Sequence, residues 1–525
     1  TSLSYASLNA QANQLCRYLQ AEGINTGDIV AVLLARGANL VVSLLAIAKA
    51  GATYLPLDPD HPAERLKHIL TTAQPKLVIT AAATADVVDW PVQMQIDDPA
   101  TAAALHAQEQ STPPARTLSQ HQAAYVLFTS GSTGQPKGVL VSHCGLSNFL
   151  AAMQRDIALL PGHHMLATTT IGFDIAALEL FLPLVNGASI VMVSRDVARD
   201  PTLLVQEMAD KQVTHVQGTP ALWHGLVEYQ PQAMQGITAL VGGDALPVNL
   251  AERMVELASR VIQVYGPTET TVWSTLGELT AQKLDPSLIG KPIDNTQIYI
   301  LDSALQPAPV GQAGELYIAG EGLAFGYLQR PDLTSERFVA NPFGNPGERM
   351  YRTGDMARWD EEYRLCFLGR VDNQVKIRGY RIELGDIENA LMALPTVKHA
   401  LVMVHDGNTA GQKHLIAWVI ADGVTLSPQN LRASLEEKLP EYMIPSAIVP
   451  LESYPLTANG KIDRRALPVP SFTLDAPVLP VTEREKTLCQ LFADCLGITP
   501  PGVNDSFFHL GGHSLLALQL LSRLR

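Results

Sequence analysis

The sequence predicts an α/β protein with several domains, and three observations support this prediction. The chain has 525 residues, which is too long for one compact core. Between residues 29 and 266, short β-branched runs alternate with helical stretches, a pattern typical of layered α/β architecture around largely parallel sheets. After residue 276 the pattern changes, first to strands rich in Gly and Pro and then to a smaller α+β region, which indicates further subdomains.

The first of these regions carries the strand–helix alternation. The strands that we predict in it are residues 29–34, 76–80, 125–129, 189–193, 213–216 and 261–265. Residues 175–185 and 249–259 have the composition of helices. Because the strands are apolar along most of their length, we expect them to be buried on both faces.

The later regions are predicted in the same way. Between residues 276 and 369 we expect a β-rich subdomain that includes strands 297–301 and 315–319. The α+β region that follows contains predicted helices 387–394 and 428–438 and predicted strands 400–404 and 415–420. Four prolines at positions 468–480 indicate a semi-rigid linker. Two more helices are predicted at 482–493 and 514–524.

Composition and charge disfavour several classes of function. The net charge of −14 argues against nucleic-acid binding. The five cysteines lack zinc-finger spacing, which suggests a reducing, cytoplasmic setting. The apolar stretch 29–57 contains Arg36 and Lys49, so we expect no membrane span, and we see no signal peptide. The first residue is not Met and the last residues are helical in pattern, so we expect a longer polypeptide.

A loop rich in Gly, Ser and Thr predicts a phosphate site. Residues 129–138 spell Thr-Ser-Gly-Ser-Thr-Gly-Gln-Pro-Lys-Gly between apolar strands 125–128 and 139–141. We expect the glycines, Gly138 included, to adopt backbone angles closed to other residues, so that amides and the Lys137 ammonium surround phosphate. The loop is not a P-loop, because Gly138 follows the lysine. A flexible linker is disfavoured between two buried strands.

Several charged residues stand at chemically suggestive places. Glu269 is the last residue of the motif Tyr-Gly-Pro-Thr-Glu, which follows a predicted strand. A carboxylate at this position can hold a magnesium ion that also binds phosphate oxygens. Taken alone, this glutamate would more simply be solvated in a turn. Asp174 precedes an apolar helical stretch, where helix capping is the alternative. Lys461 lies in an Asn-Gly turn, where most lysines are solvated.

These motifs and others in the same order are similar to those of the adenylate-forming superfamily, which includes acyl-CoA synthetases and firefly-type luciferases. The chain resembles most the adenylation module of a nonribosomal peptide synthetase joined to part of its carrier domain. The matching stretches are 3–8, 49–58, 129–138, 265–269, 314–318, 351–355, 369–374, 439–443 and 459–464. One departure is Phe325, where the family usually has arginine; we expect no loss of function from it.

The resemblance implies the fold class and the domain limits. It implies a large N-terminal adenylation subdomain (1–371) with layered α/β sheets and a β-rich part, and a small mobile α+β C-terminal subdomain (372–467). A linker (468–480) and a partial helical peptidyl carrier domain (481–525) follow. Asp372 matches the family's hinge residue, about which the small subdomain is expected to turn.

The resemblance also implies ATP and magnesium as cofactors and assigns residues to them. Glu269 is expected to hold magnesium and Thr268 to touch the α-phosphate. Lys461 is expected to bridge the substrate carboxylate and the α-phosphate, where a preplaced cation stabilises developing negative charge. Tyr265 is expected to stack on adenine, and Asp355 to bind the ribose hydroxyls. The other expected nucleotide contacts are Thr129, Ser130, Gly131, Ser132, Thr133, Gly134, Lys137, Gly243, Gln263 and Arg370.

The substrate implied by the resemblance is an amino acid. Asp174 matches the aspartate that pairs with the α-ammonium, for which acyl-CoA synthetases have no need. The positions that match the family's amino acid pocket are Asp174, Ile175, Leu178, Gln217, Leu240, Gly242, Val264, Val272, Trp273 and Lys461. The remaining side chains are uncharged and several are large, and the set resembles a glycine-selecting pattern. Glycine is therefore expected, and alanine is the second choice.

The last motif resembles a carrier-domain site for 4′-phosphopantetheine. Ser514 follows two glycines and opens a stretch with leucines at helical spacing, and a helix N-terminus favours a phosphodiester. A hydrolase nucleophile elbow is excluded because Leu516 occupies its final glycine position; a helix-capping serine is the plainer alternative. The resemblance implies covalent 4′-phosphopantetheine on Ser514, a phosphopantetheinyl transferase as partner, and neighbouring synthetase modules.

The expected reaction has two steps: an aminoacyl-adenylate forms with release of pyrophosphate, and the pantetheine thiol then displaces AMP. The sequence disfavours two rival functions. An acyl-CoA synthetase is disfavoured by Asp174 and the carrier motif. A non-catalytic scaffold is disfavoured by the intact set Lys137, Glu269, Asp355 and Lys461.

Overall fold

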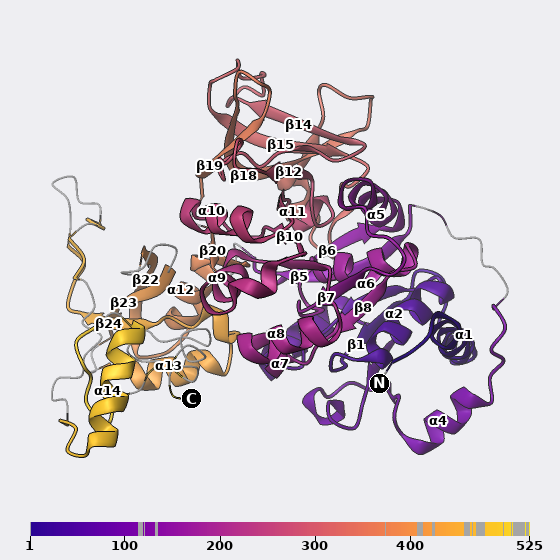
Figure 1. Ribbon diagram of the computed structural model, residues 1–525, viewed down its shortest axis with the longest axis horizontal. Helices are drawn as coiled ribbons and strands as arrows, with labels where there is room; N and C mark the ends of the chain where they lie inside the picture. Colours follow the sequence, from indigo (N-terminus) through magenta and orange to yellow (C-terminus); the bar gives the residue numbers. More distant parts are fainter. Residues whose placement is uncertain are drawn as a thin grey trace. The chain divides into compact units, whose positions relative to one another are not determined.

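The computed structural model describes two compact units. The residues that it describes are 2–113, 119, 121–131, 135–372, 374–377, 379–406, 413–422, 426–455, 462–464, 466–468, 478–496, 498–505, 507, 520 and 524. The first unit holds those within 1–129, 136–198 and 203–372, and the second holds the remainder (Figure 1).

The first unit contains two seven-stranded sheets. The first sheet has the order β16 (Gly326–Tyr327), β6 (Lys137–Ser142), β5 (Ala123–Thr129), β2 (Thr53–Pro56), β1 (Ile29–Val32), β3 (Leu77–Thr80) and β4 (Gln93–Gln95). The second has the order β13 (Lys291–Pro292), β12 (Thr275–Leu279), β11 (Arg260–Tyr265), β10 (Thr238–Val241), β9 (His215–Gly218), β7 (His164–Ala167) and β8 (Ser189–Met192). In each sheet five strands pair in parallel and two at one edge pair antiparallel.

Helices alternate with the strands along this part of the chain. They are α1 (Tyr5–Ala21), α2 (Ala38–Ala50), α3 (Ala63–Ala73), α4 (Pro99–His106), α5 (His143–Ile157), α6 (Ala176–Val185), α7 (Arg195–Arg199), α8 (Pro201–Asp210), α9 (Pro220–Tyr229), α10 (Val248–Leu257) and α11 (Pro331–Arg337). Short 3₁₀ turns are η1 (Ala85–Val87), η2 (Pro231–Met234) and η3 (Thr268–Thr270). Their ends follow local chemistry: Ser4 caps α1 through the Ser7 amide, and Gly51 ends α2 with a φ of 76°.

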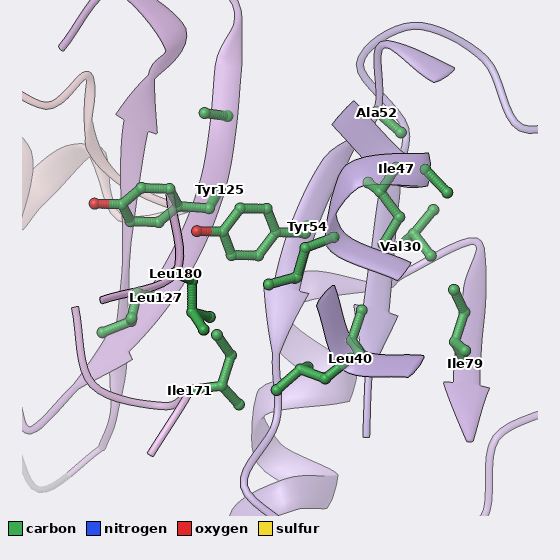
Figure 2. Packing of buried hydrophobic residues seen from close by; sticks show 14 of the residues in the cluster. Val30, Leu40, Ile47, Ala52, Tyr54, Ile79, Tyr125, Leu127, Ile171 and Leu180 are labelled. Atoms are coloured by element: carbon green, nitrogen blue, oxygen red, sulfur yellow. The ribbon is translucent and has the colours of Figure 1, made fainter. Parts of the chain in front are cut away.

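The core of the first sheet is closely packed at its centre. Figure 2 shows Tyr54 of β2 and Tyr125 of β5 side by side, with Ile47 and Leu40 of α2 nearby. The two tyrosine rings stack with centroids 5.3 Å apart. They belong to a cluster of buried apolar residues that joins α1 and α2 to the sheet.

A third, antiparallel sheet completes the first unit. It has the order β14 (Thr296–Leu301), β15 (Gly314–Gly320), β18 (Arg349–Trp359) and β17 (Phe338–Ala340), and β19 (Leu365–Arg370) pairs with β18. Labels β14, β15, β18 and β19 lie close together at the top of Figure 1. This sheet is the β-rich subdomain that the sequence predicted.

The second unit has a small α+β core. Strands β22 (Val397–Asp406), β23 (Lys413–Ala421) and β24 (Ala447–Leu451) form one sheet, and β20 (Gln374–Ile377) pairs with β21 (Tyr380–Glu383). Helices α12 (Leu384–Met392) and α13 (Pro428–Glu436) and turn η4 (Glu441–Met443) accompany them, and α14 (Glu483–Leu496) follows. Within the described part of the chain, no helix is long and apolar enough to cross a membrane.

The predicted fold class is confirmed, with two refinements. The sheets are parallel at their centres, and each ends in an antiparallel edge that the sequence pattern did not show. The reason given for Gly138 was wrong. Gly138 lies in strand β6 without a left-handed φ, and a Cβ there would lie 3.0 Å from the Phe128 ring and from Val126 Cγ1. Glycine is needed at this position for close packing. Predicted helix 514–524 falls mostly outside the described residues.

Gly290 lies where the second and third sheets meet, and it provides a test of this packing. Its φ is +83°, and a Cβ would lie 2.0 Å from the Leu276 carbonyl oxygen. We expect Gly290→Ala to lower the free energy of unfolding by about 2–5 kcal/mol, through left-handed strain plus overpacking. Gly311 is the matched control, because its φ is +84° but a Cβ would meet nothing within 4 Å. Gly311→Ala should lower the free energy of unfolding by only about 1–2 kcal/mol. Equal losses of unfolding free energy in the two variants, measured by denaturant unfolding, would contradict close packing at Gly290.

Candidate active site

The candidate site lies at the carboxyl ends of parallel strands in the second sheet. Gln217 on β9 and Leu240 on β10 are partners in register, and Val264 lies near the end of β11. In α/β sheets, ligands bind beyond this edge. The structure therefore brings together three of the expected pocket residues that are far apart in the sequence.

A buried ion pair joins this edge to the first sheet. Lys137 Nζ on β6 lies 3.7 Å from Glu269 Oε1 in η3, and the two side chains are 6% and 0% exposed. The Tyr327 hydroxyl on β16 donates to Glu269 Oε1 at 2.7 Å and accepts from Lys137 Nζ at 3.3 Å. The Lys137 ammonium also lies 4.6 Å from the centre of the Tyr327 ring, within cation–π range. Three side chains thus share one charged cluster.

Main-chain hydrogen bonds hold the segment that carries Tyr327. The Phe325 and Leu328 amides donate to carbonyls of β6, at Leu140 and Gly138, over 2.9 and 2.7 Å. The Ala324 amide donates to the Glu269 carbonyl at 2.9 Å. The segment 324–328 therefore binds the first sheet on one side and η3 on the other. These two attachments fix the position of Glu269.

The backbone beside Glu269 is strained. Thr271 and Val272 both have left-handed φ values, of 62° and 67°. Such angles are rare for β-branched residues and cluster at functional sites. The strained turn is held by the Thr271 hydroxyl, which donates to the Gly322 carbonyl at 2.6 Å, and by a close approach at Gly266, where a Cβ would lie 2.4 Å from the Val272 carbonyl oxygen.

The Asp174 carboxylate contacts the turn that carries Thr268. The Thr268 hydroxyl donates to Asp174 Oδ2 at 2.6 Å, and the bond is buried. The N-cap of α6 is Ile175, which makes no side-chain capping bond, and this counts against the alternative in which Asp174 caps the helix. The residue expected to bind an amino group and the residue expected to touch the α-phosphate are therefore in direct contact.

A second charged cluster surrounds Asp355 on β18. Its carboxylate accepts from the Tyr265 hydroxyl and pairs with Arg370 of β19. Burial, and then the neighbouring Asp355, raise the pKa of Tyr265 well above its usual value, so the phenol stays protonated as a donor. Arg370 also binds both carboxylate oxygens of Asp372 at 2.7 Å. Gly354 allows this arrangement, because a Cβ there would lie 2.8 Å from Arg370 Nη2.

The expected apolar pocket residues are all buried in one cluster. They are Ile175, Leu178, Leu240, Val264, Val272 and Trp273. Gly242 lies against them, and a Cβ there would lie 2.4 Å from the Val264 carbonyl oxygen and 3.1 Å from Trp273 Cη2. The tryptophan ring therefore occupies the space that a side chain at position 242 would need.

The structure describes some of the remaining predicted site residues and leaves others outside its described ranges. Thr129 ends β5 opposite Lys137, so Ser130 and Gly131 begin the connection between the two strands. Gln263 donates to the Pro286 carbonyl at 2.7 Å, and Gly243 has a φ of +83°. Neither the hydrogen bond of Gln263 nor the backbone angle of Gly243 bears on adenine binding. Ser132, Thr133, Gly134, Lys461 and Ser514 lie outside the described residues.

Two residues of the site were missed in the sequence. Tyr327 lies in the stretch 322–328, in which Phe325 is the departure from the family pattern. Glu179 is the one charged residue of the apolar helix α6, and its carboxylate accepts from Gln217 Nε2 at 3.1 Å. A charged residue inside an otherwise apolar helix was the signal that could have identified it.

Family models match most of the chain. Residues 1–328 match the AMP-binding enzyme model, residues 386–461 match its C-terminal domain, and residues 486–525 match the phosphopantetheine attachment site. The chain therefore belongs to the AMP-binding enzymes. Its relatives define it further, as an adenylate-forming ligase of the nonribosomal peptide synthetase type with a carrier domain.

The relatives are much longer synthetases. A dimodular nonribosomal peptide synthase of Bacillus subtilis (strain 168) is 46% identical over 528 residues, which cover 100% of this chain and 22% of the relative. Tyrocidine synthase 2 of Brevibacillus parabrevis is 40% identical over 99% of this chain and 14% of its own length. This chain thus spans between about a seventh and a fifth of these relatives.

Solved structures agree with this assignment. Holo-PA1221, which contains adenylation and peptidyl carrier domains, is 30% identical with a TM-score of 0.83, over 99% of this chain and 87% of that one. Holo-AB3403, a four-domain synthetase bound to AMP and glycine, is 39% identical with a TM-score of 0.65, over 99% of this chain and 39% of that one. The family expected from the motifs is confirmed.

The Tyr327 hydroxyl should contribute to stability through its two charged partners. Tyr327→Phe keeps the ring, which packs edge-on against Phe338 at 5.6 Å, and removes only the hydroxyl. We expect the free energy of unfolding to fall by about 1.5–3 kcal/mol, as for hydrogen bonds to charged groups, measured without nucleotide. Tyr299→Phe is the control, because the Tyr299 ring also packs on a phenylalanine but its hydroxyl has no hydrogen bond to any described residue. A loss of equal size in the control would refute the bridging role.

Proposed function

We propose that this chain activates glycine with ATP and loads it onto its own carrier domain. The glycine carboxylate attacks the α-phosphorus of ATP, pyrophosphate leaves, and glycyl-AMP forms. In the second step a thiol attacks the glycyl carbonyl and AMP leaves. The single observation that supports this most is the 2.6 Å contact between Asp174 and Thr268, because the residue proposed to bind the α-ammonium then lies beside the residue proposed to touch the α-phosphate.

The chemistry of Asp174 favours an amino acid over a plain carboxylic acid. The residue is 5% exposed and stands beside the apolar cluster that contains Ile175 and Trp273. A buried carboxylate is well suited to bind a cation, and the α-ammonium of an amino acid is such a cation. A fatty acid has no ammonium group for Asp174 to bind, which counts against an acyl-CoA synthetase.

The large side chains expected to line the pocket favour glycine, with alanine as the second choice. Trp273 lies over Gly242, and Gln217 bonds to the Trp273 indole at 2.9 Å. These large side chains leave little room for a substrate side chain, and a filled pocket excludes larger substrates by clash. AB3403, which is 39% identical, was solved with AMP and glycine, which supports the same choice.

Nucleotide binding is proposed for the two charged clusters. Lys137 and the loop 129–134 would hold phosphates, Thr268 the α-phosphate, and Asp355 with Arg370 the ribose; Tyr265, Gly243 and Gln263 would line the adenine site. Glu269 fits a magnesium ion, because magnesium in nucleotide sites needs only one or two carboxylates besides phosphate oxygens and water. When bound, that ion would neutralise charge on the phosphates.

The residues outside the described part keep their proposed roles. Lys461 supplies a cation between carboxylate and α-phosphate, and Ser514 carries 4′-phosphopantetheine attached by a phosphopantetheinyl transferase. We place the domain limits at 1–371, 372–467, 468–480 and 481–525, with Asp372 as the hinge; the first compact unit ends at this residue. Neighbouring modules of a longer synthetase and a cytoplasmic location complete the proposal.

Amino acid selection is tested by ATP–pyrophosphate exchange. Glycine should give the highest kcat/KM, alanine should be lower by about tenfold or more, since one methylene in a pocket changes rates by roughly 10–200-fold, and a fatty acid should give none. The highest rate with a large amino acid would overturn the choice of glycine. Exchange with a fatty acid alone would favour the acyl-CoA synthetase alternative.

A pair of variants separates the two steps. Lys461→Ala should slow exchange by roughly 10²–10³-fold, as when one donor that stabilises developing charge is removed. Ser514→Ala should leave exchange unchanged and abolish covalent loading of radiolabelled glycine after treatment with a phosphopantetheinyl transferase. Normal exchange in Lys461→Ala would contradict the role of this lysine, and loading of Ser514→Ala would contradict the attachment site.

A further inference from the structure

Helix α6 carries a buried carboxylate that the proposed reaction does not use. Glu179 is 0% exposed and is surrounded in its helix by apolar residues. Burying a carboxylate without hydrogen-bond partners costs free energy. The partners of Glu179 therefore indicate its role in the fold. Burial raises the pKa of Glu179, and hydrogen bonds from Thr169 and Gln217 together with the Arg36 charge oppose this rise.

The hydrogen bonds of Glu179 form a chain that ends at the substrate pocket. Its Oε2 accepts from the Thr169 amide at 2.9 Å, and its Oε1 accepts from the Thr169 hydroxyl and from Gln217 Nε2 at 3.1 Å. Gln217 Nε2 also donates to the Ile175 carbonyl at 2.8 Å, and Gln217 Oε1 accepts from Trp273 Nε1 at 2.9 Å. Every bond in the chain has a fixed direction.

The direction of these bonds determines how Gln217 is oriented. Both acceptors around its amide group, the Glu179 carboxylate and the Ile175 carbonyl, can receive only its Nε2 protons. The amide oxygen must therefore face Trp273, whose indole N–H can only donate. With its nitrogen held in this way, the Trp273 ring is kept over Gly242, where its Cη2 would lie 3.1 Å from an added Cβ.

We propose that Glu179 is a positioning residue for substrate selection: by orienting Gln217 it holds Trp273 in the pocket and so sets the size of side chain that the enzyme accepts. The inference rests on the proposed function, because it assumes that Trp273 lines the amino acid pocket. Glu179 lies behind Gln217 and touches no substrate in this scheme. Its effect on selectivity passes through the two pocket residues.

Replacement by glutamine isolates the role of the carboxylate. Glu179→Gln keeps the shape of the side chain but turns one of its two acceptor oxygens into an N–H donor. Whichever way the new amide turns, its NH₂ faces either the Gln217 amide or the Thr169 amide, both of which are donors. When the NH₂ faces Gln217, one of the two acceptors that orient the Gln217 amide is lost, and the Trp273 indole can move away from Gly242.

The test compares the full-length chain with its variants by ATP–pyrophosphate exchange. The readout is the ratio of kcat/KM between the amino acid that the wild type prefers and the one larger by a methylene. We expect Glu179→Gln to lower this ratio about tenfold, which is the scale of one-methylene discrimination, while the KM for ATP stays within about twofold. Gln217→Leu should lower the ratio similarly. The double variant should be no worse than Gln217→Leu, because coupled residues are not additive.

Thr169→Val is the matched control. It removes one hydrogen bond from the same carboxylate but leaves the bond to Gln217, so its ratio should stay within about twofold of the wild type. An unchanged ratio in Glu179→Gln, or an equal fall in Thr169→Val, would overturn the inference while wild-type exchange upholds the proposed function. No amino-acid-dependent exchange by the wild type would overturn both. If Glu179→Gln is insoluble, the same ratio is measured for Glu179→Asp. The shorter side chain moves the carboxylate away from Gln217.

Discussion

The buried pair between Lys137 and Glu269 is the contact on which the arrangement of the site depends. It joins strand β6 of the first sheet to the turn that follows β11 of the second, and the Tyr327 hydroxyl contacts both charges. Charges this deeply buried tolerate little displacement, because each would otherwise lose its partner in a medium of low polarity. The edges of the two sheets are therefore held together at the place where phosphate chemistry is proposed.

The same constraint explains why the site tolerates strain. Thr271 and Val272 keep left-handed backbones directly after η3, and such angles persist only when the surroundings determine them. Here the segment that carries Tyr327 bonds to both sides of the turn. The turn places Thr268 against Asp174 and Val272 with Trp273 in the apolar cluster. One strained turn thus carries residues proposed for the nucleotide side and residues proposed for the substrate side.

The periodicity of the sequence predicted the alternation of strands and helices and located many of the strands. The strands around Tyr125 and Val261 and the helix after Asp174 lie within a residue or two of their expected limits. Pairing direction was not predictable in the same way, because an apolar strand fits either a parallel or an antiparallel neighbour. Gly138 shows a second gap: glycine in a loop motif suggested backbone freedom, whereas the ring of Phe128 on the next strand is what excludes a side chain.

By itself, the sequence determined the family, the residue types available for binding phosphate and an amino acid, and the positions expected to line the pocket. These follow from local order along the chain, which needs no knowledge of contacts. Only the tertiary structure decided which of these residues support one another. The bond from Thr268 to Asp174, the hydroxyl of Tyr327 between two charges, and the carboxylate of Glu179 behind Gln217 join residues that are 38 to 190 positions apart. Hydrogen-bond direction and burial in three dimensions select these pairs, and neither has a signature in linear spacing.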